Sequence, residues 1–460
     1  WRVSQRIEAT FADALPANDY NLRNVLTHNG TGGATFPTPA QTGLLERTTG
    51  VAPVSGALNA AYLRGSRALE RSNGGTLRNR PVLLGDIVNS SPFYLRTNET
   101  IFVGANDGMM HAVNALTGDV RFSYVPKGLD FTKLGSLSDP AYVHAFFVDG
   151  PVTVSSDRID PARSILVGTL GRGGKGAYAL DVTTPSAMDA ADVLWDDTGS
   201  TDPDMGYSTG LPLIAKGNNA QKLAIVANGM NSTSEDAALF IYELETGALI
   251  RKIKVGQAGG NGLASPRGAD VNGDGIVDFV YAGDLRGNVW KFNLTGTDAN
   301  TWEVAFSGAP LFVAKDGSGN IQPITGGLAI ARDPSSTPLW IAVGTGRLIE
   351  EADMTSTAKQ SVYVWIDNGT APITGRIDLT ERTIAATGVD GTGQPVRAFE
   401  EYSELLATKR GCFVDLGVPS PAADGERVVS GMRIRGRALF FSSVIPNSGT
   451  DCESSGSGYL

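Results

Sequence analysis

Short apolar runs and glycine-rich turns alternate along most of this chain. Residues 281–296 read YAGDLRGNVWKFNLTG, and residues 103–118 read VGANDGMMHAVNALTG. In both strings an apolar run precedes a Gly/Asp turn, and a run of alternating apolar and polar residues follows it. Because alternation with period two places apolar side chains on one face of a strand, each string predicts a β-hairpin. Gly108 and Gly287 stand at the turns, where positive φ angles are expected.

The hairpin recurs at even intervals. The two clear copies and three looser copies with longer turns each contain a glycine near the end of the first strand, and the intervals between these glycines are 64, 61, 54 and 61 residues. The five positions are Gly104, Gly168, Gly229, Gly283 and Gly344. A small antiparallel sheet that recurs every fifty to sixty residues or so is typical of a β-propeller, in which each blade packs against its neighbours.

Two further segments extend the predicted propeller. Residues 427–444 read as another hairpin, and residues 81–95 provide a strand before the first clear copy. The sequence therefore predicts an all-β fold, a quinoprotein-like β-propeller of about six or seven irregular blades over residues 81–460. An array of separate β-sandwiches is the alternative, but separate sandwiches do not share one turn signature at even spacing.

Residues 1–80 follow a different pattern and predict a partly helical extension packed on the propeller. In residues 57–71, which read ALNAAYLRGSRALER, Leu58, Tyr62 and Leu69 fall on roughly one helical face. The basic residues of this region are expected to form a solvated face: Arg64, Arg67, Arg71, Arg78 and Arg80.

The segment DVNGDGIVD, residues 270–278, places oxygen-bearing groups at alternate positions around a glycine hinge at Gly275. This spacing is typical of a calcium loop. Tyr281 stands at the twelfth position, where a helix–loop–helix calcium site needs a bidentate Glu, so we predict a loop that leads directly into a β-strand. A polar turn without an ion is the alternative, although nearby carboxylates repel one another unless a cation or water separates them. The candidate ligands are the side chains of Asp270, Asn272, Asp274 and Asp278 and the main-chain carbonyl of Ile276.

Bulk properties exclude some classes of function. The formal net charge of −10 argues against nucleic acid as a partner, because the chain has no basic stripe to neutralise phosphates. No run of about 18 uninterrupted apolar residues is present, so no membrane-spanning segment is expected. The chain begins at Trp1 without a Met or a charged-then-apolar leader, which suggests a fragment or a processed form whose targeting signal is not shown.

The two cysteines, Cys412 and Cys452, both lie near the C-terminus. In an exported chain they are expected to pair, because a disulfide would order a Ser/Gly-rich tail that has little apolar surface of its own. In a cytosolic chain both would stay as thiols. Zinc binding is not expected, because His28, His111 and His144 are scattered and give no ligand spacing with the cysteines.

Six strings in one order resemble the C-terminal domain of the PilC/PilY family of type IV pilus biogenesis factors and tip-associated adhesins. They extend from about Ala61 to about Leu294 and read YLRGSRALE with RNRPVLLGDIVNSSP, IFVGANDGMMHAVNALTG, GRGGKGAYALDVTTP, DMGYSTGLP and GDLRGNVWKFNL. The resemblance implies a modified β-propeller with a calcium loop, and it carries the five candidate ligands over to the positions named above.

The resemblance also implies a function. It points to a non-enzymatic, calcium-binding component of type IV pili (fimbriae) that promotes pilus assembly and extension, opposes retraction, and supports cell adhesion and twitching motility. The implied partners are minor pilins or other pilus machinery, with a host or abiotic surface as a further contact. The implied location is outside the cytoplasm: the cell surface or pilus tip, the outer membrane or the periplasm.

Two alternatives belong to other classes of function. A pyrroloquinoline-quinone dehydrogenase has similar blade repeats, but it needs a catalytic Asp, an adjacent cysteine pair or aromatic sandwich, and cationic groups beside the quinone, and the two cysteines here are 40 residues apart. A free-standing calcium-dependent carbohydrate or matrix adhesin could use Trp290, Trp302 or Trp365 for stacking, although Trp290 and Trp365 lie in strand patterns that predict core packing.

The acidic run 195–207, with Pro203 and irregular spacing, predicts an exposed loop rather than a second cation site.

Overall fold

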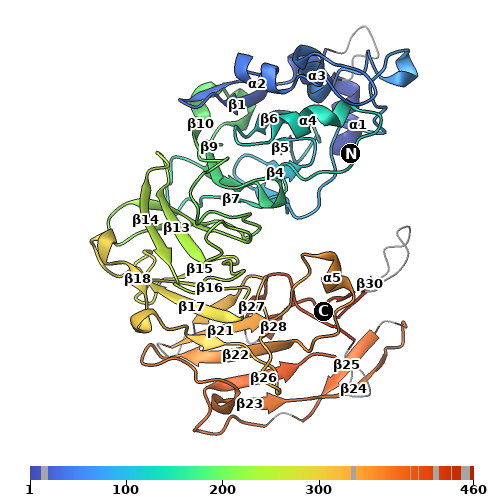
Figure 1. Ribbon diagram of the computed structural model, residues 1–460. Coiled ribbons are helices and arrows are strands. Elements are labelled where there is room, and N and C mark those ends of the chain that lie inside the picture. The colour runs from blue at the N-terminus through green and yellow to red at the C-terminus, as the bar shows by residue number, and fades with distance from the viewer. Residues whose placement is uncertain are drawn as a thin grey trace. The chain divides into compact units, whose positions relative to one another are not determined.

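The computed structural model describes residues 1–11, 19–332, 338–393, 395–401, 403–417, 424–436, 438–446 and 456–459 (Figure 1). The chain divides into two compact units, and each is described by itself. Unit 1 consists of Trp1–Lys216, Gln221–Thr233 and Ile241–Ile250, and unit 2 consists of Gly217–Ala220, Ser234–Phe240 and Arg251–Leu460.

The helices are short, and three of the α-helices precede residue 80. The α-helices are α1 (Val3–Phe11), α2 (Pro39–Leu44), α3 (Gly56–Arg64), α4 (Phe131–Gly135) and α5 (Glu351–Met354). The 3-10 helices are η1 (Tyr20–Leu22), η2 (Arg71–Asn73), η3 (Ser136–Ser138), η4 (Gly171–Gly173), η5 (Pro185–Ala187), η6 (Ala190–Asp192), η7 (Ala299–Thr301), η8 (Phe306–Gly308) and η9 (Arg376–Asp378). In the part of the chain that the structure describes, every helix is too short or too polar to cross a lipid bilayer.

The first sheet has six strands in the order β2-β1-β6-β5-β4-β3. Its pairs are antiparallel except for β1 and β6, which run parallel. The N-terminal segment therefore contributes two strands as well as helices, and the predicted domain boundary at residue 80 stays a prediction. The strands are β1 (Val25–His28), β2 (Gly33–Thr35), β3 (Phe93–Leu95), β4 (Thr100–Ala105), β5 (Met109–Asn114) and β6 (Val120–Val125).

The next two sheets have four strands each and follow chain order. One has the order β10-β9-β8-β7 and the other the order β11-β12-β13-β14. The strands are β7 (Val152–Val154), β8 (Ile165–Thr169), β9 (Ala177–Asp181), β10 (Val193–Asp196), β11 (Leu213–Lys216), β12 (Lys222–Ala227), β13 (Ala238–Glu243) and β14 (Leu249–Lys254).

Unit 2 contains two five-stranded sheets. One has the order β15-β16-β17-β18, with β19 also paired to β17, and the other has the order β20-β21-β22-β26-β23. Figure 1 shows β21, β22, β26 and β23 lying side by side. The strands are β15 (Arg267–Ala269), β16 (Phe279–Gly283), β17 (Asn288–Asn293), β18 (Glu303–Val304), β19 (Phe312–Val313), β20 (Ala329–Arg332), β21 (Leu339–Gly344), β22 (Ser361–Asp367), β23 (Leu379–Arg382) and β26 (Gly411–Asp415).

Three two-stranded sheets complete the described strands. β27 pairs with β28 inside the hairpin predicted at 427–444. Because the described residues hold five sheets of four or more strands and three of two, the predicted blade number stays a prediction. The pairs are β24 (Ile384–Val389) with β25 (Pro395–Phe399), β27 (Arg433–Arg435) with β28 (Ala438–Phe440), and β29 (Ile445–Pro446) with β30 (Gly456–Ser457).

The predicted repeat hairpins are confirmed. β4 pairs antiparallel with β5, and β16 with β17, while Gly108 and Gly287 have φ angles of +91° and +76° at the turns. The looser copies form β8–β9, β12–β13 and β21–β22. The recurring glycines also permit close packing: a Cβ at Gly283 would lie 2.2 Å from Ile324 Cγ2. The spacing of the glycines therefore reports close packing beside each strand.

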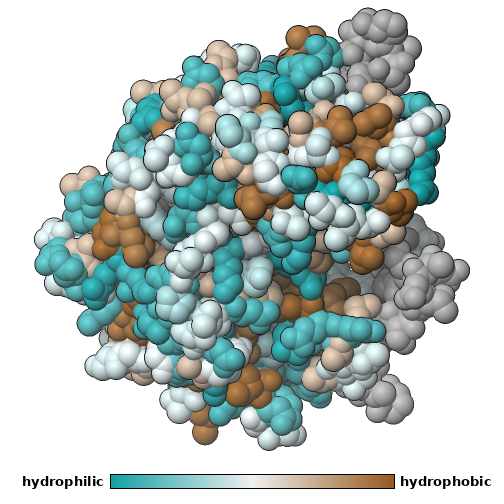
Figure 2. Space-filling model, turned by 45° about the horizontal axis from the view of Figure 1, so that its top comes forward, coloured by the Kyte–Doolittle hydropathy of each residue, from teal (hydrophilic) through white to brown (hydrophobic). Residues whose placement is uncertain are grey.

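Each unit has its own hydrophobic core. The core of unit 1 includes Tyr62, Phe102 and Tyr124, and that of unit 2 includes Tyr281 and Trp365. Burying one such side chain stabilises the fold by about 1.5–3 kcal/mol relative to leaving it in water. On the face drawn in Figure 2, apolar residues form small patches between polar ones.

The helix predicted within residues 57–71 ends earlier than expected. α3 ends at Arg64 because Gly65 adopts a φ of +131° and caps its last turn. Tyr62 is buried as predicted, but Leu58 and Leu69 are exposed, so the predicted apolar face is wrong. The buried residues of α3 are Gly56, Asn59, Ala60, Tyr62 and Leu63.

Two of the arginines expected on a solvated face instead lie half-buried in an ion-pair cluster with Glu70. Arg80 Nε donates to Glu70 Oε1 at 2.8 Å, and Arg67 Nη1 donates to Glu70 Oε2 at 2.9 Å. The Arg80 guanidinium also lies 3.6 Å from the ring centre of Tyr62. The prediction is wrong here because Glu70 is almost completely buried and each of its oxygens needs a partner.

The acidic run 195–207 is not the exposed loop that we predicted. Asp196 belongs to β10 and is buried, as is Asp204. Asp196 Oδ2 accepts hydrogen bonds from the Tyr124 hydroxyl at 2.6 Å and from the Lys127 main-chain N–H at 2.9 Å. The carboxylate is therefore part of the internal hydrogen bonding of unit 1.

Candidate functional site

The predicted calcium loop is the connection between β15 and β16. Ala269 pairs with Phe279, so the nine residues between them form the closed end of a hairpin. Gly273 and Gly275 have φ angles of +84° and +85°, which side chains with a Cβ rarely adopt. The prediction that the loop leads directly into a strand is confirmed, while the strand before it was not predicted.

The carboxylate of Asp270 organises the loop from its first position. Oδ1 accepts the main-chain N–H of Gly273 at 2.6 Å, and Oδ2 accepts the main-chain N–H of Gly275 at 2.8 Å. Both interactions follow the chain around its reversal. The loop is therefore wound about Asp270, with its amide groups turned inward.

Asn272 and Asp274 lie together on the exposed part of the loop. Asn272 Nδ2 donates to Asp274 Oδ2 at 2.9 Å, and the Asp274 N–H donates to Asn272 Oδ1 at 3.0 Å. Asp274 Oδ1 also accepts the Ile276 N–H at 2.8 Å. These two side chains are in contact with solvent and can exchange their loop contacts for another partner at low cost.

Asp278 anchors the other end of the loop and is only 4% exposed. Its Oδ2 accepts the N–H of Val271 at 2.8 Å, and its own N–H donates to the Ala269 carbonyl at 2.9 Å. The Val271 carbonyl in turn accepts from Arg332 Nη2 at 2.5 Å. The first and last acidic residues of the loop therefore hold both of its ends.

Every candidate ligand of the loop is an oxygen atom, the donor type that a hard cation prefers, and residues 272–275 are exposed. Within the described residues, however, no three His, Cys, Asp or Glu side chains converge closely enough to hold a metal ion. One candidate ligand is an amide and another is a main-chain carbonyl, and the three carboxylates accept hydrogen bonds from loop amides. Calcium as the ligand of this loop stays a prediction.

A second acidic turn in the same sheet is closed to ligands. Asp284, between β16 and β17, is fully buried, and its Oδ1 accepts the N–H groups of Arg286 and Asn288 at 2.9 and 2.8 Å. Its Oδ2 accepts from Asn261 Nδ2, Asn288 Nδ2 and Trp290 Nε1 at 2.9, 2.9 and 2.8 Å. Five protein donors surround this carboxylate, so it has a structural role.

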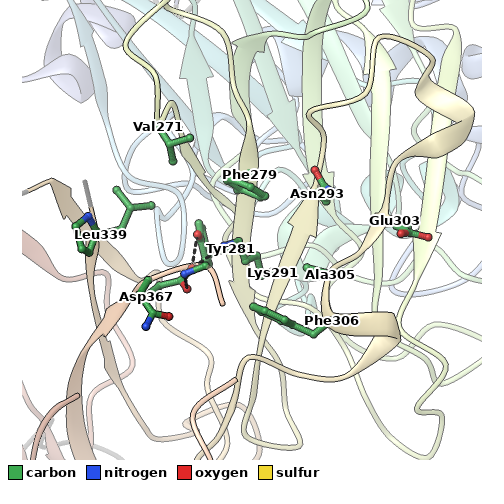
Figure 3. Close-up of a pocket in the computed structure, with 13 residues that line it drawn as sticks. Val271, Phe279, Tyr281, Lys291, Asn293, Glu303, Ala305, Phe306, Leu339 and Asp367 are labelled. Carbon is green, nitrogen blue, oxygen red and sulfur yellow. Dashed lines mark hydrogen bonds and ion pairs between the residues drawn. The ribbon is translucent and has the colours of Figure 1, made fainter. Parts of the chain in front are cut away.

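A pocket of about 540 Å³ adjoins the loop in unit 2 (Figure 3). Val271 of the loop forms part of its wall, and Phe279 follows directly from the loop on β16. The figure shows the labelled side chains arranged around one hollow, with Asp367, Tyr281 and Lys291 joined by hydrogen bonds. The lining residues are Val271, Phe279, Tyr281, Lys291, Asn293, Glu303, Ala305, Phe306, Pro338, Leu339, Asp367, Asn368 and Gly369.

The base of the pocket is a buried ion pair. Lys291 Nζ donates to Asp367 Oδ2 at 2.8 Å, and the Tyr281 hydroxyl donates to the same oxygen at 2.8 Å. Burial raises the pKa of Asp367, but the hydrogen bond and the charge of Lys291 lower it by more. The pKa of Asp367 therefore lies below its usual value. Burial, followed by the charge of Asp367, raises the pKa of Tyr281. The sequence did not reveal this group, because Lys291 and Asp367 are 76 positions apart.

Unit 1 contains an Asp–His–Ser arrangement that sequence reasoning also missed. His111 Nε2 lies 3.0 Å from Asp107 Oδ2, and His111 Nδ1 lies 3.0 Å from Ser123 Oγ. Arg23 Nη2 is 3.3 Å from Ser123 Oγ, and burial lowers the pKa of Arg23 to about 10. Because Ser123 and His111 are fully buried, no substrate can reach the hydroxyl, and the arrangement serves packing.

Other candidates from the sequence have different outcomes. Trp290 and Trp365 are buried as predicted, and Trp302 is fully buried as well, so none of the three can stack on a sugar. Cys412 lies on β26 and has no disulfide partner among the described residues, and burial raises the pKa of its thiol. Cys452 lies outside the described residues, so the predicted disulfide stays a prediction.

Comparison with known proteins places the chain in a family. The family model of the PilY1 beta-propeller domain matches residues 87–384. A type IV pilus biogenesis factor PilY1 homolog of Xylella fastidiosa is 38% identical over 87% of this chain and 30% of its own length. Type IV pilus biogenesis factor PilY1 of Pseudomonas aeruginosa strain UCBPP-PA14 is 33% identical over 86% of this chain and 40% of its own length.

A solved structure gives the same result. The crystal structure of the Pseudomonas aeruginosa PilY1 C-terminal domain has a TM-score of 0.65 with this chain at 30% identity, and the alignment covers 75% of this chain and 76% of that one. The chain spans less than half the length of the two curated relatives described above. The predicted all-β propeller class and the family resemblance are both confirmed, and this chain belongs to the PilY1 family.

Proposed function

We propose that this chain is a non-enzymatic, calcium-binding component of the type IV pilus system that promotes pilus assembly and extension and opposes retraction. The observation that carries the proposal is the loop Asp270–Asp278, an all-oxygen donor set on a surface hairpin of a PilY1-family domain. The curated relatives are named type IV pilus biogenesis factors, which supports the choice of machinery.

The loop would hold the ion through Asp270, Asn272, Asp274, Asp278 and the carbonyl of Ile276. A bound cation supplies charge neutralisation and a fixed centre for oxygen donors. In its absence, three carboxylates within nine residues repel one another and are compensated only by loop amides. We expect the β15–β16 connection to be looser in that state, so that a partner meets two different surfaces.

The proposed setting is outside the cytoplasm, at the cell surface or pilus tip, the outer membrane or the periplasm. The proposed partners are minor pilins or other parts of the pilus machinery. Through the pilus, the chain would support attachment to host or abiotic surfaces and twitching motility. These assignments rest on family membership and on the names of the relatives.

Calorimetry tests the calcium site directly. Calcium titrated into the chelator-stripped protein should bind at a ratio near one ion per chain, and Asp278→Ala should remove that binding. Asp316→Ala is the matched control, because Asp316 also organises an exposed Gly/Asn turn through the N–H groups of Ser318 and Asn320. Binding that survives Asp278→Ala, or that is lost in Asp316→Ala, would contradict the assignment to this loop.

Pilus counts test the cellular role. In a bacterium that lacks its own copy of this protein, the full-length parent with Asp278→Ala should yield fewer surface pili than the wild type. If the chain opposes retraction, removing the retraction motor should restore the pili of the variant. Wild-type numbers of pili and normal twitching in the variant, despite loss of calcium binding in calorimetry, would overturn the regulatory role.

A further inference from the structure

We propose that the pocket beside the loop binds an apolar side chain of a partner peptide together with the main-chain carbonyl next to it. Its volume of about 540 Å³ lies within the range of roughly 300–1,000 Å³ typical of ligand pockets. Apolar groups form its walls and a buried ammonium lies at its base, which is the usual arrangement of a site that recognises one oriented group.

The apolar wall includes an aromatic ring on a strained backbone. Phe306 has a φ of +55°, and the following Ser307 has a φ of +56°. A bulky residue seldom adopts this left-handed conformation, which costs of order 1–3 kcal/mol and is concentrated at ligand clamps and other functional sites. In Figure 3 the Phe306 ring lies beside Lys291 at the edge of the hollow. The strain holds the ring where a ligand can contact it.

The base of the pocket retains hydrogen-bond donors. The ammonium of Lys291 carries three N–H groups, its side chain is only 6% exposed, and Asp367 is its one hydrogen-bond acceptor among the described residues. The ring centre of Phe279 lies 4.1 Å from Nζ and stabilises the charge without accepting a conventional hydrogen bond. An acceptor on a ligand would complete the coordination of this ammonium.

The acceptors of the base are already engaged. Asp367 Oδ2 accepts from Lys291 and Tyr281, and its Oδ1 accepts the N–H of Gly369 at 2.8 Å. Asp367 also balances the charge of Lys291, so an additional carboxylate would leave a net negative charge in a buried place. A neutral acceptor is therefore favoured over an acid.

The side-chain oxygens of the two asparagines that line the pocket also accept hydrogen bonds already. Asn293 Oδ1 accepts from the N–H and hydroxyl of Thr295, and Asn368 Oδ1 accepts from the N–H and hydroxyl of Thr370. Sugar hydroxyls need both donors and acceptors from a protein, and the lining offers mainly donors, with the exposed carboxylate of Glu303 on β18. A peptide carbonyl beside an apolar side chain matches these hydrogen-bond donors and the apolar walls better than a sugar does.

Small capped amino acids test the pocket. In ligand-observed NMR with the whole protein, N-acetyl-L-phenylalanine amide should bind more tightly than N-acetyl-L-phenylalanine, whose carboxylate is charged, and N-acetylglucosamine should not compete. Ala305→Phe should abolish binding by filling the pocket. Phe306→Gly should weaken it on the order of tenfold, since it removes the ring. Because this change also relieves the positive φ, it should leave the fold intact.

Phe399→Ala is the control, because Phe399 lies on β25, is 56% exposed and does not line the pocket. It should leave binding unchanged. Failure of the neutral probe to bind, unchanged affinity in both pocket variants, preference for the acid, or competition by the sugar would each overturn the proposal. Thermal unfolding of each variant separates loss of binding from loss of fold.

A coupling between pocket and loop rests on the proposed calcium binding. Val271 lines the pocket, while its N–H holds Asp278. Calcium should therefore change the affinity for the neutral probe, and the probe should change the affinity for calcium by the same factor. Asp278→Ala should remove the effect of calcium on the affinity for the probe. Equal probe affinity with and without bound calcium would contradict the coupling while leaving both sites standing.

Discussion

Two acidic turns of one sheet, the loop at 270–278 and the turn at Asp284, have similar compositions and opposite environments. Both combine an aspartate with glycine and asparagine. In the loop, Asp270 accepts two main-chain N–H groups and Asp274 is exposed. Asp284 is fully buried and accepts five hydrogen bonds. Residue type therefore does not decide how completely protein donors surround the carboxylate of an acidic turn. Asp284 is enclosed by five donors, whereas Asp274 is exposed to solvent.

The largest expected effect comes from breaking the closed turn. Asp284→Ala should lower the free energy of unfolding by about 3–5 kcal/mol, because it removes the acceptor that the buried donors of Asn261, Asn288 and Trp290 share and leaves Trp290 Nε1 unpaired. Asp270→Ala should cost about 1 kcal/mol or less, because water can reach the amides that it releases. Urea unfolding of both variants measures the difference. Equal losses would contradict the distinction between the turns.

The open loop should respond to calcium where the closed turn does not. At a free calcium concentration one hundred times the dissociation constant, wild-type stability should increase by about 2.7 kcal/mol. Asp278→Ala should abolish this increase. In hydrogen exchange, calcium should protect the amides of Gly273, Gly275 and Ile276 more than those of Arg286 and Asn288. Uniform protection across both turns would indicate global stabilisation by ions bound elsewhere.

Acidification should reveal a third arrangement, the buried pair of Lys291 and Asp367. The folded pKa of Asp367 lies below its unfolded value of roughly 3.9, so its stabilising contribution is fully present above that pH. The contribution is lost as the pH falls through the folded pKa. We expect unit 2 to lose stability below about pH 4, and the NMR signals of Tyr281 can follow the change. A transition centred near neutral pH would show that a different group is responsible.

Much of this structure could be predicted from local sequence patterns. The rest depends on contacts between residues that are distant in the sequence. The hairpins could be predicted because alternating side chains and turn glycines are a property of a few consecutive residues. The loop could be predicted for the same reason. Lys291 reads as an outward polar residue on β17, yet it is buried because Asp367 arrives from β22. Glu70 likewise forms ion pairs with Arg67 and Arg80, which are therefore shielded from solvent. No local pattern predicts the positive φ of Phe306.

The smallest expected effect concerns a further acidic turn, that of Asp316, and it gives the most direct test of the comparison. Asp316 resembles Asp270 in detail: it is followed by two glycines at alternate positions, and its Oδ1 accepts the N–H groups of Ser318 and Asn320 at 2.8 Å each. Its Oδ2 accepts from Asn320 Nδ2, and burial raises its pKa less than these hydrogen bonds lower it.

The turn of Asp316 holds one carboxylate where the loop at 270–278 holds three, so it has too few oxygen donors for calcium. Asp316→Ala should change stability by about 0.5 kcal/mol or less and should leave the calcium titration unchanged. If an exposed Asp/Gly/Asn turn were sufficient for calcium, the wild type would bind two ions and this variant one. A single ion in both proteins would show that the number of oxygen ligands available in the turn, and not the shape of the turn, determines where the cation binds.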